Sequence, residues 1–158
     1  MKHSYFSRRL LSVFMAFALG LSVLLAKDFV VVIDAGHGGH DPGSLGSKAK
    51  EKNINLGVAL KLGRLIENNM QGVKVVYTRK KDVYLTLQER ANIANKVQGD
   101  LFISIHTNSL DKKSPNRRKV AGASTWTLGL HRSKENLEVA KRENSVIYLE
   151  NDFSTRYE

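Results

Sequence analysis

Short runs of hydrophobic residues recur along this chain, and each is bounded by polar or glycine-rich sequence. Three of them, FVVVID at 29–34, VKVVYT at 73–78 and LFISIH at 101–106, are rich in β-branched residues. Runs of this length and composition are typical of strands buried in a sheet. A fourth strand is predicted over 123–128, where the sequence is ASTWTL.

Between these runs the hydrophobic residues change to helical spacing. From Glu51 a hydrophobic stripe continues until Gly72, which is a helix stop signal. Thr86 and Glu89 have the spacing of a capping box, and this second helix is predicted to reach about Gln98. A last helix is predicted from after Ser133 to about Leu149.

The predicted order of elements is therefore β-α-β-α-β-β-α. Strands that alternate with helices of this length predict an α/β fold, with a mainly parallel twisted sheet and helices on both faces.

The first 26 residues differ from the rest of the chain. Lys2, Arg8 and Arg9 form a basic start, and residues 10–26 then contain no charged residue. This pattern predicts a secretory signal peptide over 1–26, followed by one domain over 27–158. It also predicts export to the periplasm or cell envelope, with no stable membrane span after cleavage. An uncleaved N-terminal anchor is the alternative, because the uncharged run of 17 residues is close to the length of about 20 residues that a bilayer span takes.

The charge of the remaining chain is strongly positive. Residues 1–26 hold three of the 25 basic residues and none of the 15 acidic ones, so the remainder has a formal net charge of +7. Such a charge favours polyanionic partners, and export argues against nucleic acid among them. The chain has no cysteine, so a metal ion must be held by histidine and carboxylate side chains.

Three candidate ligands follow the predicted strands at one edge of the sheet. His37 lies just after the first strand, His106 closes the third, and Glu51 opens the helix after the glycine-rich loop. Functional groups of open α/β sheets gather at the carboxyl ends of the strands. Two imidazoles and one carboxylate are a ligand set for catalytic zinc, which keeps a fourth position for water. Each residue alone has an ordinary structural explanation, and only their joint placement indicates a metal site.

The residues around His37 add to this hypothesis. Glycines on both sides of His37 allow a sharp turn and leave the site open to a bulky substrate. Asp34 is a candidate hydrogen-bond partner that orients a ligand histidine through the ring nitrogen that does not bind the metal. The alternative is that Asp34 caps the loop.

A larger set of motifs resembles the zinc-dependent N-acetylmuramoyl-L-alanine amidases, in the same order as in that family. The matching segments are VVIDAGHGGHDPGS at 31–44, EKNINL at 51–56, Thr78-Arg79 with Asp82, LQERANIAN at 87–95 and DLFISIHTNS at 100–109. The resemblance implies zinc ligands at His37, Glu51 and His106, and a substrate or supporting contact at Asn108. It also implies peptidoglycan as the substrate, cleaved between N-acetylmuramic acid and L-alanine, and an activator protein as a candidate partner.

The family's general base, a glutamate on a later strand, has no counterpart in this sequence. Glu143 and Glu150 fall on or beside the last predicted helix, where a carboxylate is expected to face solvent. The sequence therefore predicts a catalytic domain that is incomplete at its C-terminal part, with no assigned general base.

Two other interpretations stay open. A catalytically impaired fragment could bind wall polymer without cutting it, helped by basic residues between 112 and 119. Two histidines and one carboxylate also form the iron site of non-haem oxygenases, although those ligands usually lie closer together in sequence.

Overall fold

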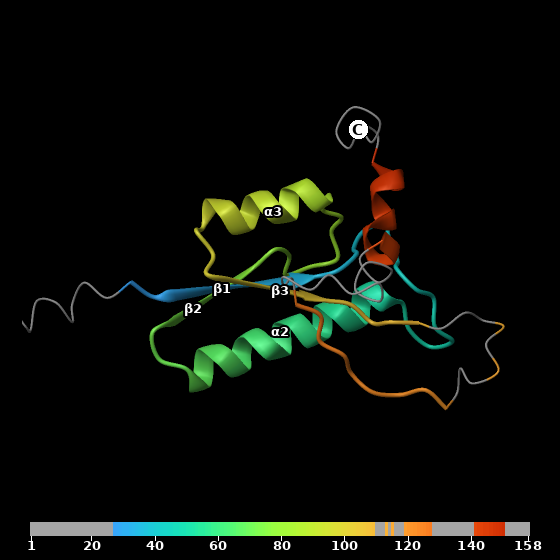
Figure 1. Cartoon of the computed structure of the whole chain (residues 1–158), viewed down its shortest axis with the longest axis horizontal. Coiled ribbons are helices and arrows are strands. Elements are labelled where there is room, and N and C mark those ends of the chain that lie inside the picture. The colour runs from blue at the N-terminus through green and yellow to red at the C-terminus, as the bar shows by residue number, and fades with distance from the viewer. Residues whose placement is uncertain (1–26, 110–112, 114, 116–118, 128–140, 151–158) are drawn as a thin grey trace, which may run out of the picture.

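The computed structural model describes residues 27–109, 113, 115, 119–127 and 141–150, and its centre is a parallel sheet (Figure 1). The strands are β1 (Phe29–Ala35), β2 (Val73–Tyr77) and β3 (Leu101–Ile105). Their order across the sheet is β2-β1-β3, and β1 pairs in parallel with both neighbours. The predicted α/β fold with a parallel sheet is confirmed.

Strand β1 is the buried centre of the domain. All of its residues except Phe29 are buried, and Val32 and Ile33 have no exposed surface. A central strand covered on both faces buries both of its side-chain directions. This explains why the sequence of β1 shows no alternation of apolar and polar residues.

Two helices cover the sheet from opposite sides (Figure 1). Helix α2 (Glu51–Asn69) packs on the face that carries Val31 and Ile33, and its Ala59 joins them in the core. Helix α3 (Leu87–Lys96) starts with the predicted capping box. There the Thr86 hydroxyl accepts from the Glu89 N–H at 3.1 Å, and the Glu89 carboxylate accepts from the Thr86 N–H at 2.8 Å.

Two glycines of α2 have opposite surroundings. At Gly63 the helix passes directly over Tyr77, and a methyl group on Gly63 would collide with the phenol ring. At Gly57, apart from the backbone of the helix itself, no atom of the described residues lies within 4 Å of the place that a methyl group would take. The close approach of α2 to β2 therefore depends on Gly63.

The C-terminal part differs from the prediction. Residues 123–127 form neither helix nor strand, so the predicted strand over 123–128 is wrong for these residues, and Leu128 lies outside the described part. Most of the last predicted helix also lies outside it. Residues 141–143 are helical and continue into the 3-10 helix η1 (Asn144–Leu149), which ends where the helix was predicted to end.

The predicted signal peptide at 1–26 lies outside the described residues. Within the described part, none of the helices combines the length and hydrophobicity that crossing a bilayer requires.

Candidate metal centre

His37 lies in the glycine-rich loop between β1 and α2. Its backbone has a φ of 62°, a left-handed conformation that is uncommon for a residue with a side chain. The backbones of Gly38 and Asp41 pair across the loop and close it into a tight turn. Within this turn, the Asp41 carboxylate lies 2.7 Å from Nδ1 of His37. That contact directs the other ring nitrogen, Nε2, away from Asp41 and toward α2.

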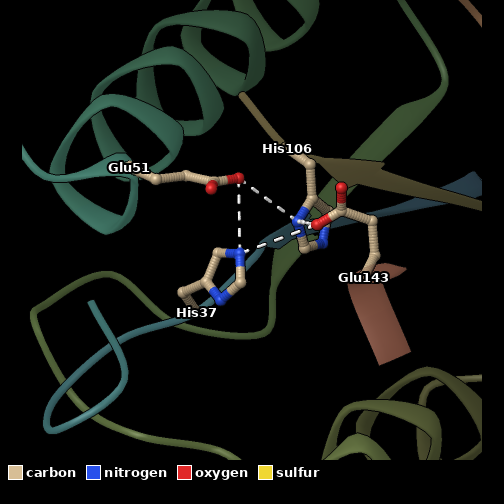
Figure 2. Close-up of side chains that lie close together, drawn as sticks. All are labelled: His37, Glu51, His106 and Glu143. Atoms are coloured by element: carbon tan, nitrogen blue, oxygen red, sulfur yellow. Dashed lines mark ion pairs between the residues drawn. The ribbon is translucent and has the colours of Figure 1, made fainter. Parts of the chain in front are cut away.

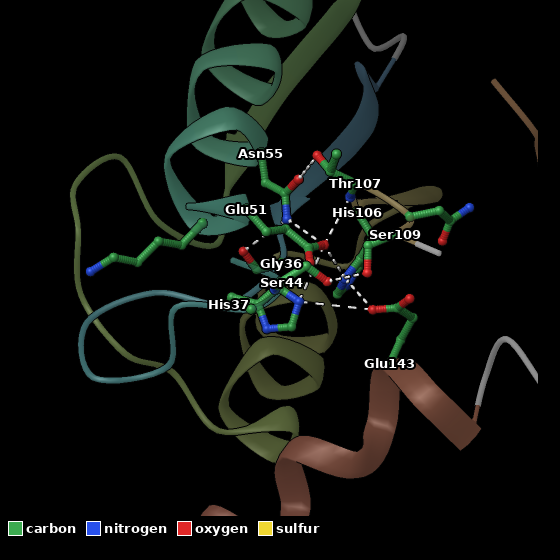
Figure 3. Close-up of polar contacts among 12 residues, drawn as sticks. Gly36, His37, Ser44, Glu51, Asn55, His106, Thr107, Ser109 and Glu143 are labelled. Carbon is green, nitrogen blue, oxygen red and sulfur yellow. Dashed lines mark hydrogen bonds and ion pairs between the residues drawn. The ribbon is translucent and has the colours of Figure 1, made fainter. Parts of the chain in front are cut away.

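Glu51 is the first residue of α2, and it is only 3% exposed. Its Oε2 accepts the Ser44 N–H at 2.9 Å, and its Oε1 accepts the Thr107 N–H at 2.8 Å. Asn55, one turn further along the helix, donates to Oε1 at 3.3 Å (Figure 3). The carboxylate is thus fixed from three sides. A carboxylate is also favoured at a helix N-terminus, where backbone N–H groups concentrate positive potential.

His106 follows β3 directly, and its ring stands edge-on to the ring of His37. The two ring centroids are 4.9 Å apart, with an interplanar angle of 78°. Gly36 makes this approach possible, because a methyl group there would overlap the His106 ring. Gly43 has a similar role, since a methyl group added there would lie 2.6 Å from the His37 ring.

The structure brings the three predicted ligands together at the carboxyl edge of the sheet (Figure 2). Oε1 of Glu51 lies 3.3 Å from Nε2 of His37 and 3.4 Å from Nδ1 of His106. Three segments distant in sequence therefore point their donor atoms at one place.

A fourth side chain, Glu143, joins this group, and sequence reasoning missed it. Its Oε2 lies 2.9 Å from Nδ1 of His106 and 3.8 Å from Nε2 of His37 (Figure 2). One donor atom from each of the four side chains lies within 4.8 Å of every other. The expectation that Glu143 faces solvent is wrong, because its side chain is 17% exposed.

Glu150 is also buried, at 6% exposed, and its carboxylate accepts the Leu87 N–H at the start of α3 at 3.1 Å. It caps a helix rather than facing solvent. The helical periodicity around Glu143 and Glu150 could not reveal either position, because it does not say where the segment docks.

The acids and imidazoles of the cluster stabilise each other's charged forms. Burial of the His37 ring lowers its pKa, but Asp41, Glu143 and Glu51 outweigh this and raise the pKa to about 11. Burial raises the pKa of the Glu51 carboxyl, but the adjacent His106 and His37 rings hold that pKa far below its usual range. Burial likewise raises the pKa of the Glu143 carboxyl, but the His106 and His37 rings outweigh it and hold that pKa below its usual range. The two acids are therefore ionised and paired with the protonated His37 ring, and a metal ion that binds here would displace the imidazole proton.

The donor atoms fit a metal ion. Nε2 of His37 and Nδ1 of His106 are buried, and their contacts with Glu51 and Glu143 are ion pairs that lack hydrogen-bond geometry. A buried polar atom without a hydrogen bond costs about 1–3 kcal/mol, so such atoms need an explanation. Imidazole nitrogens that converge with carboxylate oxygens form the mixed nitrogen and oxygen donor set of many transition-metal sites.

Asp34 does not have the predicted role behind a histidine. Its carboxylate accepts hydrogen bonds from Thr78 at 2.6 Å, Arg90 at 2.7 Å and Ser104 at 2.9 Å. The link to His37 is indirect, because Arg90 also donates to the His37 carbonyl at 3.0 Å. The supporting carboxylate is Asp41, four residues after His37. Sequence reasoning missed Asp41, although it lies in the same motif as Asp34, because a motif does not show which carboxylate reaches the ring.

Asn108 lies beside the cluster and not in it. Its Oδ1 accepts a hydrogen bond from Nη2 of Arg142 at 2.7 Å. Both residues line a cavity of about 620 Å³ that extends from Glu51 between the glycine-rich loop and residues 120–124. A second cavity of about 320 Å³ is lined by His37, His106 and Glu143. The cluster is therefore accessible from two sides.

Fold and site together define a class of protein: a parallel α/β domain with a His-Glu-His donor set at the carboxyl edge of its sheet. The chain belongs to the N-acetylmuramoyl-L-alanine amidase family, whose model matches residues 31–156.

Known relatives agree with this assignment. A putative N-acetylmuramoyl-L-alanine amidase of Buchnera aphidicola subsp. Acyrthosiphon pisum is 37% identical over 134 residues, which are 82% of this chain and 54% of that protein. The probable amidase AmiB of Haemophilus influenzae is 38% identical over 116 residues, 72% of this chain and 26% of that protein.

Solved structures extend the agreement to the fold. An N-acetylmuramoyl-L-alanine amidase from Clostridium difficile 630 matches with a TM-score of 0.52 and 37% identity, over 56% of this chain and 47% of that one. The amidase AmiC2 of Nostoc punctiforme matches with a TM-score of 0.50 and 40% identity, over 54% of this chain and 47% of that one. The chain thus spans about half the length, or less, of the relatives it matches.

Proposed function

We propose that this chain carries the metal centre of a zinc amidase, which hydrolyses the amide bond between N-acetylmuramic acid and L-alanine in peptidoglycan. The observation that carries the proposal is the convergence of His37, Glu51 and His106, in which Oε1 of Glu51 lies 3.3 Å and 3.4 Å from the two imidazole nitrogens. Membership of the amidase family supports the choice of substrate.

In this proposal His37 Nε2, His106 Nδ1 and Glu51 Oε1 hold the zinc ion. When bound, zinc would acidify a water molecule and polarise the amide carbonyl. Asp41 accepts a hydrogen bond from Nδ1–H of His37, so Nε2 is the ring nitrogen that would give up its proton to bind the metal. Iron is a less suitable ion, because His37 and Glu51 straddle a strand-to-helix loop, unlike the closely spaced ligands of iron oxygenases.

Binding of the substrate falls to the residues around the cluster. The cavity of about 620 Å³ reaches Glu51 and combines hydrophobic side chains, Leu45 and Ile54, with the polar Asn108. A pocket of this size and mixed character suits a glycopeptide, with the Asn108 carboxamide as a hydrogen-bonding group for the substrate.

Glu143 has a position that fits two roles. As a proton acceptor, its ionised carboxylate would take a proton from the attacking water at Oε2 and return it to the leaving amine. As a further metal ligand, it would fill the position that a catalytic zinc keeps for water. Either role gives the site an ionised carboxylate beside the two histidines.

Zinc binding is the first test of the proposal. We expect the purified chain to bind zinc, and His37→Ala or His106→Ala to abolish tight binding. The matched control is His40→Ala, because His40 is exposed, stacks on Tyr84 and lies three residues from His37. Retention of tight zinc binding by both ligand variants would refute the proposed site.

Release of dye from labelled peptidoglycan tests the reaction itself. A cleaving enzyme releases soluble dye in a zinc-dependent way, whereas a wall-binding domain co-sediments with the wall and releases none. Zinc binding without release of dye would support the proposed metal site and refute the proposed hydrolytic activity.

The proposed substrate also determines the proposed location. Peptidoglycan lies outside the cytoplasmic membrane, so we propose that residues 1–26 direct the chain to the periplasm or cell envelope. Fractionation of cells that express the tagged chain tests this. An activator protein remains a prediction from the family resemblance, and co-purification from the envelope fraction tests it.

A further inference from the structure

Arg142 lies between two residues near the metal cluster. Its Nη2 donates to Oδ1 of Asn108 at 2.7 Å and to Oε1 of Glu143 at 3.0 Å. Its Nε donates to the same Oε1 at 3.1 Å. The planar guanidinium thus joins the segment that follows β3 to the segment that carries Glu143.

The two oxygens of Glu143 have different partners. Oε1 is held by two N–H groups of Arg142, while Oε2 faces Nδ1 of His106 at 2.9 Å. A glutamate side chain loses about 1.5–2 kcal/mol of rotamer freedom when it is fixed, so its orientation needs a partner. With Oε1 held by the guanidinium, rotation of the carboxylate is restricted and Oε2 stays directed at the histidines.

Asn108 restrains the guanidinium from the other side. Asn108 lies two residues after His106, so it moves with the segment that supplies this candidate ligand. The Asn108–Arg142–Glu143 contacts therefore fix the position of Glu143 relative to His106. The sequence separation of 34 residues between Asn108 and Arg142 makes this a tertiary contact and not a local one.

These contacts are poorly placed to stabilise the fold. The side chain of Arg142 is 50% exposed, and ion pairs at the surface contribute at most about 1 kcal/mol. An interaction of about 1 kcal/mol is nevertheless enough to change the population of one side-chain orientation by about fivefold. Supporting residues around metal ligands typically change metal affinity or activity by about 10–100-fold when they are mutated.

We infer that Arg142, held by Asn108, positions the Glu143 carboxylate against the two histidines of the metal centre. Arg142 is a positioning residue, because its contacts are with Glu143 and Asn108 and not with the donor atoms of the histidines. The inference rests on the proposed metal site, and it holds for either role of Glu143.

The test is a double-mutant cycle in the full chain, with zinc affinity and dye release as readouts. The variants are Glu143→Gln, Arg142→Ala, the double variant and Arg142→Lys, which keeps the charge but loses the planar fork. The matched control is Arg64→Ala, since Arg64 is an exposed arginine of α2. Circular dichroism confirms that each variant is folded.

The expected result is that Arg142→Ala changes the same quantity as Glu143→Gln, in the same direction, by about five- to tenfold. The double variant should match Glu143→Gln alone, because Arg142 acts only through Glu143. Arg142→Lys should recover only part of the loss. Additive effects, or no change in Arg142→Ala where Glu143→Gln has one, would overturn the inference. So would a Glu143→Gln variant that behaves like the wild type in both readouts.

A measurement without metal separates this inference from the proposed function. In chelator-treated protein at one fixed pH, the histidine ring signals in a ¹H–¹³C spectrum report whether Glu143 lies against His106. Arg142→Ala and Glu143→Gln should shift the His106 signals alike, and Arg64→Ala should not. If the wild type binds no zinc, the proposed function fails while these spectra still decide whether Arg142 positions Glu143. An unshifted His106 signal in Arg142→Ala would contradict the positioning role.

Discussion

The carboxylate of Asp41 lies 2.7 Å from Nδ1 of His37, and the two residues belong to one tight turn. This contact fixes the orientation of a candidate ligand ring from the side opposite the metal cluster. The adjacent ring lowers the pKa of Asp41 against the opposing effect of burial, so the carboxylate is ionised. Such a carboxylate–histidine pair sets both the tautomer and the basicity of the ligand nitrogen.

We therefore expect Asp41→Asn to weaken zinc binding by about 10–100-fold while the protein remains folded. Competition with a chromophoric chelator measures the affinity. Asp28→Asn, at an exposed position before β1, is the control. Equal zinc affinities for the wild type and Asp41→Asn would show that the His37 ring needs no such support.

Glu143→Gln distinguishes the two roles of that residue. If Glu143 accepts a proton, the variant should bind zinc normally and lose about 10²–10⁴-fold in the rate of dye release. If Glu143 is a metal ligand, zinc affinity should fall instead, and the rate should not fall by a comparable factor. Measuring affinity and rate on one preparation separates these outcomes, and a variant unchanged in both would exclude both roles.

Gly63→Ala and Gly57→Ala form a matched pair in helix α2. Alanine is favoured over glycine within a helix by about 0.5–1 kcal/mol, so Gly57→Ala, which meets open space, should stabilise the protein by about that amount. Gly63→Ala should destabilise it, because the new methyl group collides with Tyr77. Urea unfolding compares the two, and equal shifts would mean that α2 does not pack closely on β2.

Asp82 provides a test of pH dependence away from the cluster. The Lys52 ammonium at 2.6 Å and the Gly39 N–H at 2.8 Å hold the pKa of its carboxyl below the ordinary value of 3.8. The folded protein therefore binds this proton less readily than the unfolded chain. The resulting stability is fully present above the ordinary pKa, and it is lost as the pH falls through the lower folded value.

Asp82→Asn should accordingly be less stable than the wild type at pH 7, and the difference should shrink as the pH falls below about 4. Thermal unfolding across that range measures it, with Asp28→Asn as the control. A difference that does not depend on pH would show that the contribution of Asp82 is not electrostatic.

The sequence was sufficient for the elements whose pattern is local. The β-branched run of β1, the hydrophobic stripe of α2 and the Thr86–Glu89 capping box each carry their own signal, and the structure has all three. The convergence of His37, Glu51 and His106 also follows from topology, because parallel strands end at one edge. These predictions need only the order of the elements.

Glu143 and Asp34 could not be assigned in this way. Helical periodicity around Glu143 gives the face of a helix, but not the surface on which the segment docks. Asp34 has the sequence context of a supporting residue, yet its oxygens are already used by Thr78, Arg90 and Ser104. Which of several nearby carboxylates meets a given nitrogen depends on distances that a motif does not contain.

The contacts of Arg90 have a consequence for how the domain responds to a bound ion. This single side chain from α3 donates to Asp34 of β1 and to the backbone of His37. When α3 opens, the turn that carries His37 loses these contacts. An ion that fixes this turn therefore lowers the population of molecules in which α3 is open. Amide hydrogen exchange in α3 should consequently report metal binding, although this helix supplies none of the candidate ligands.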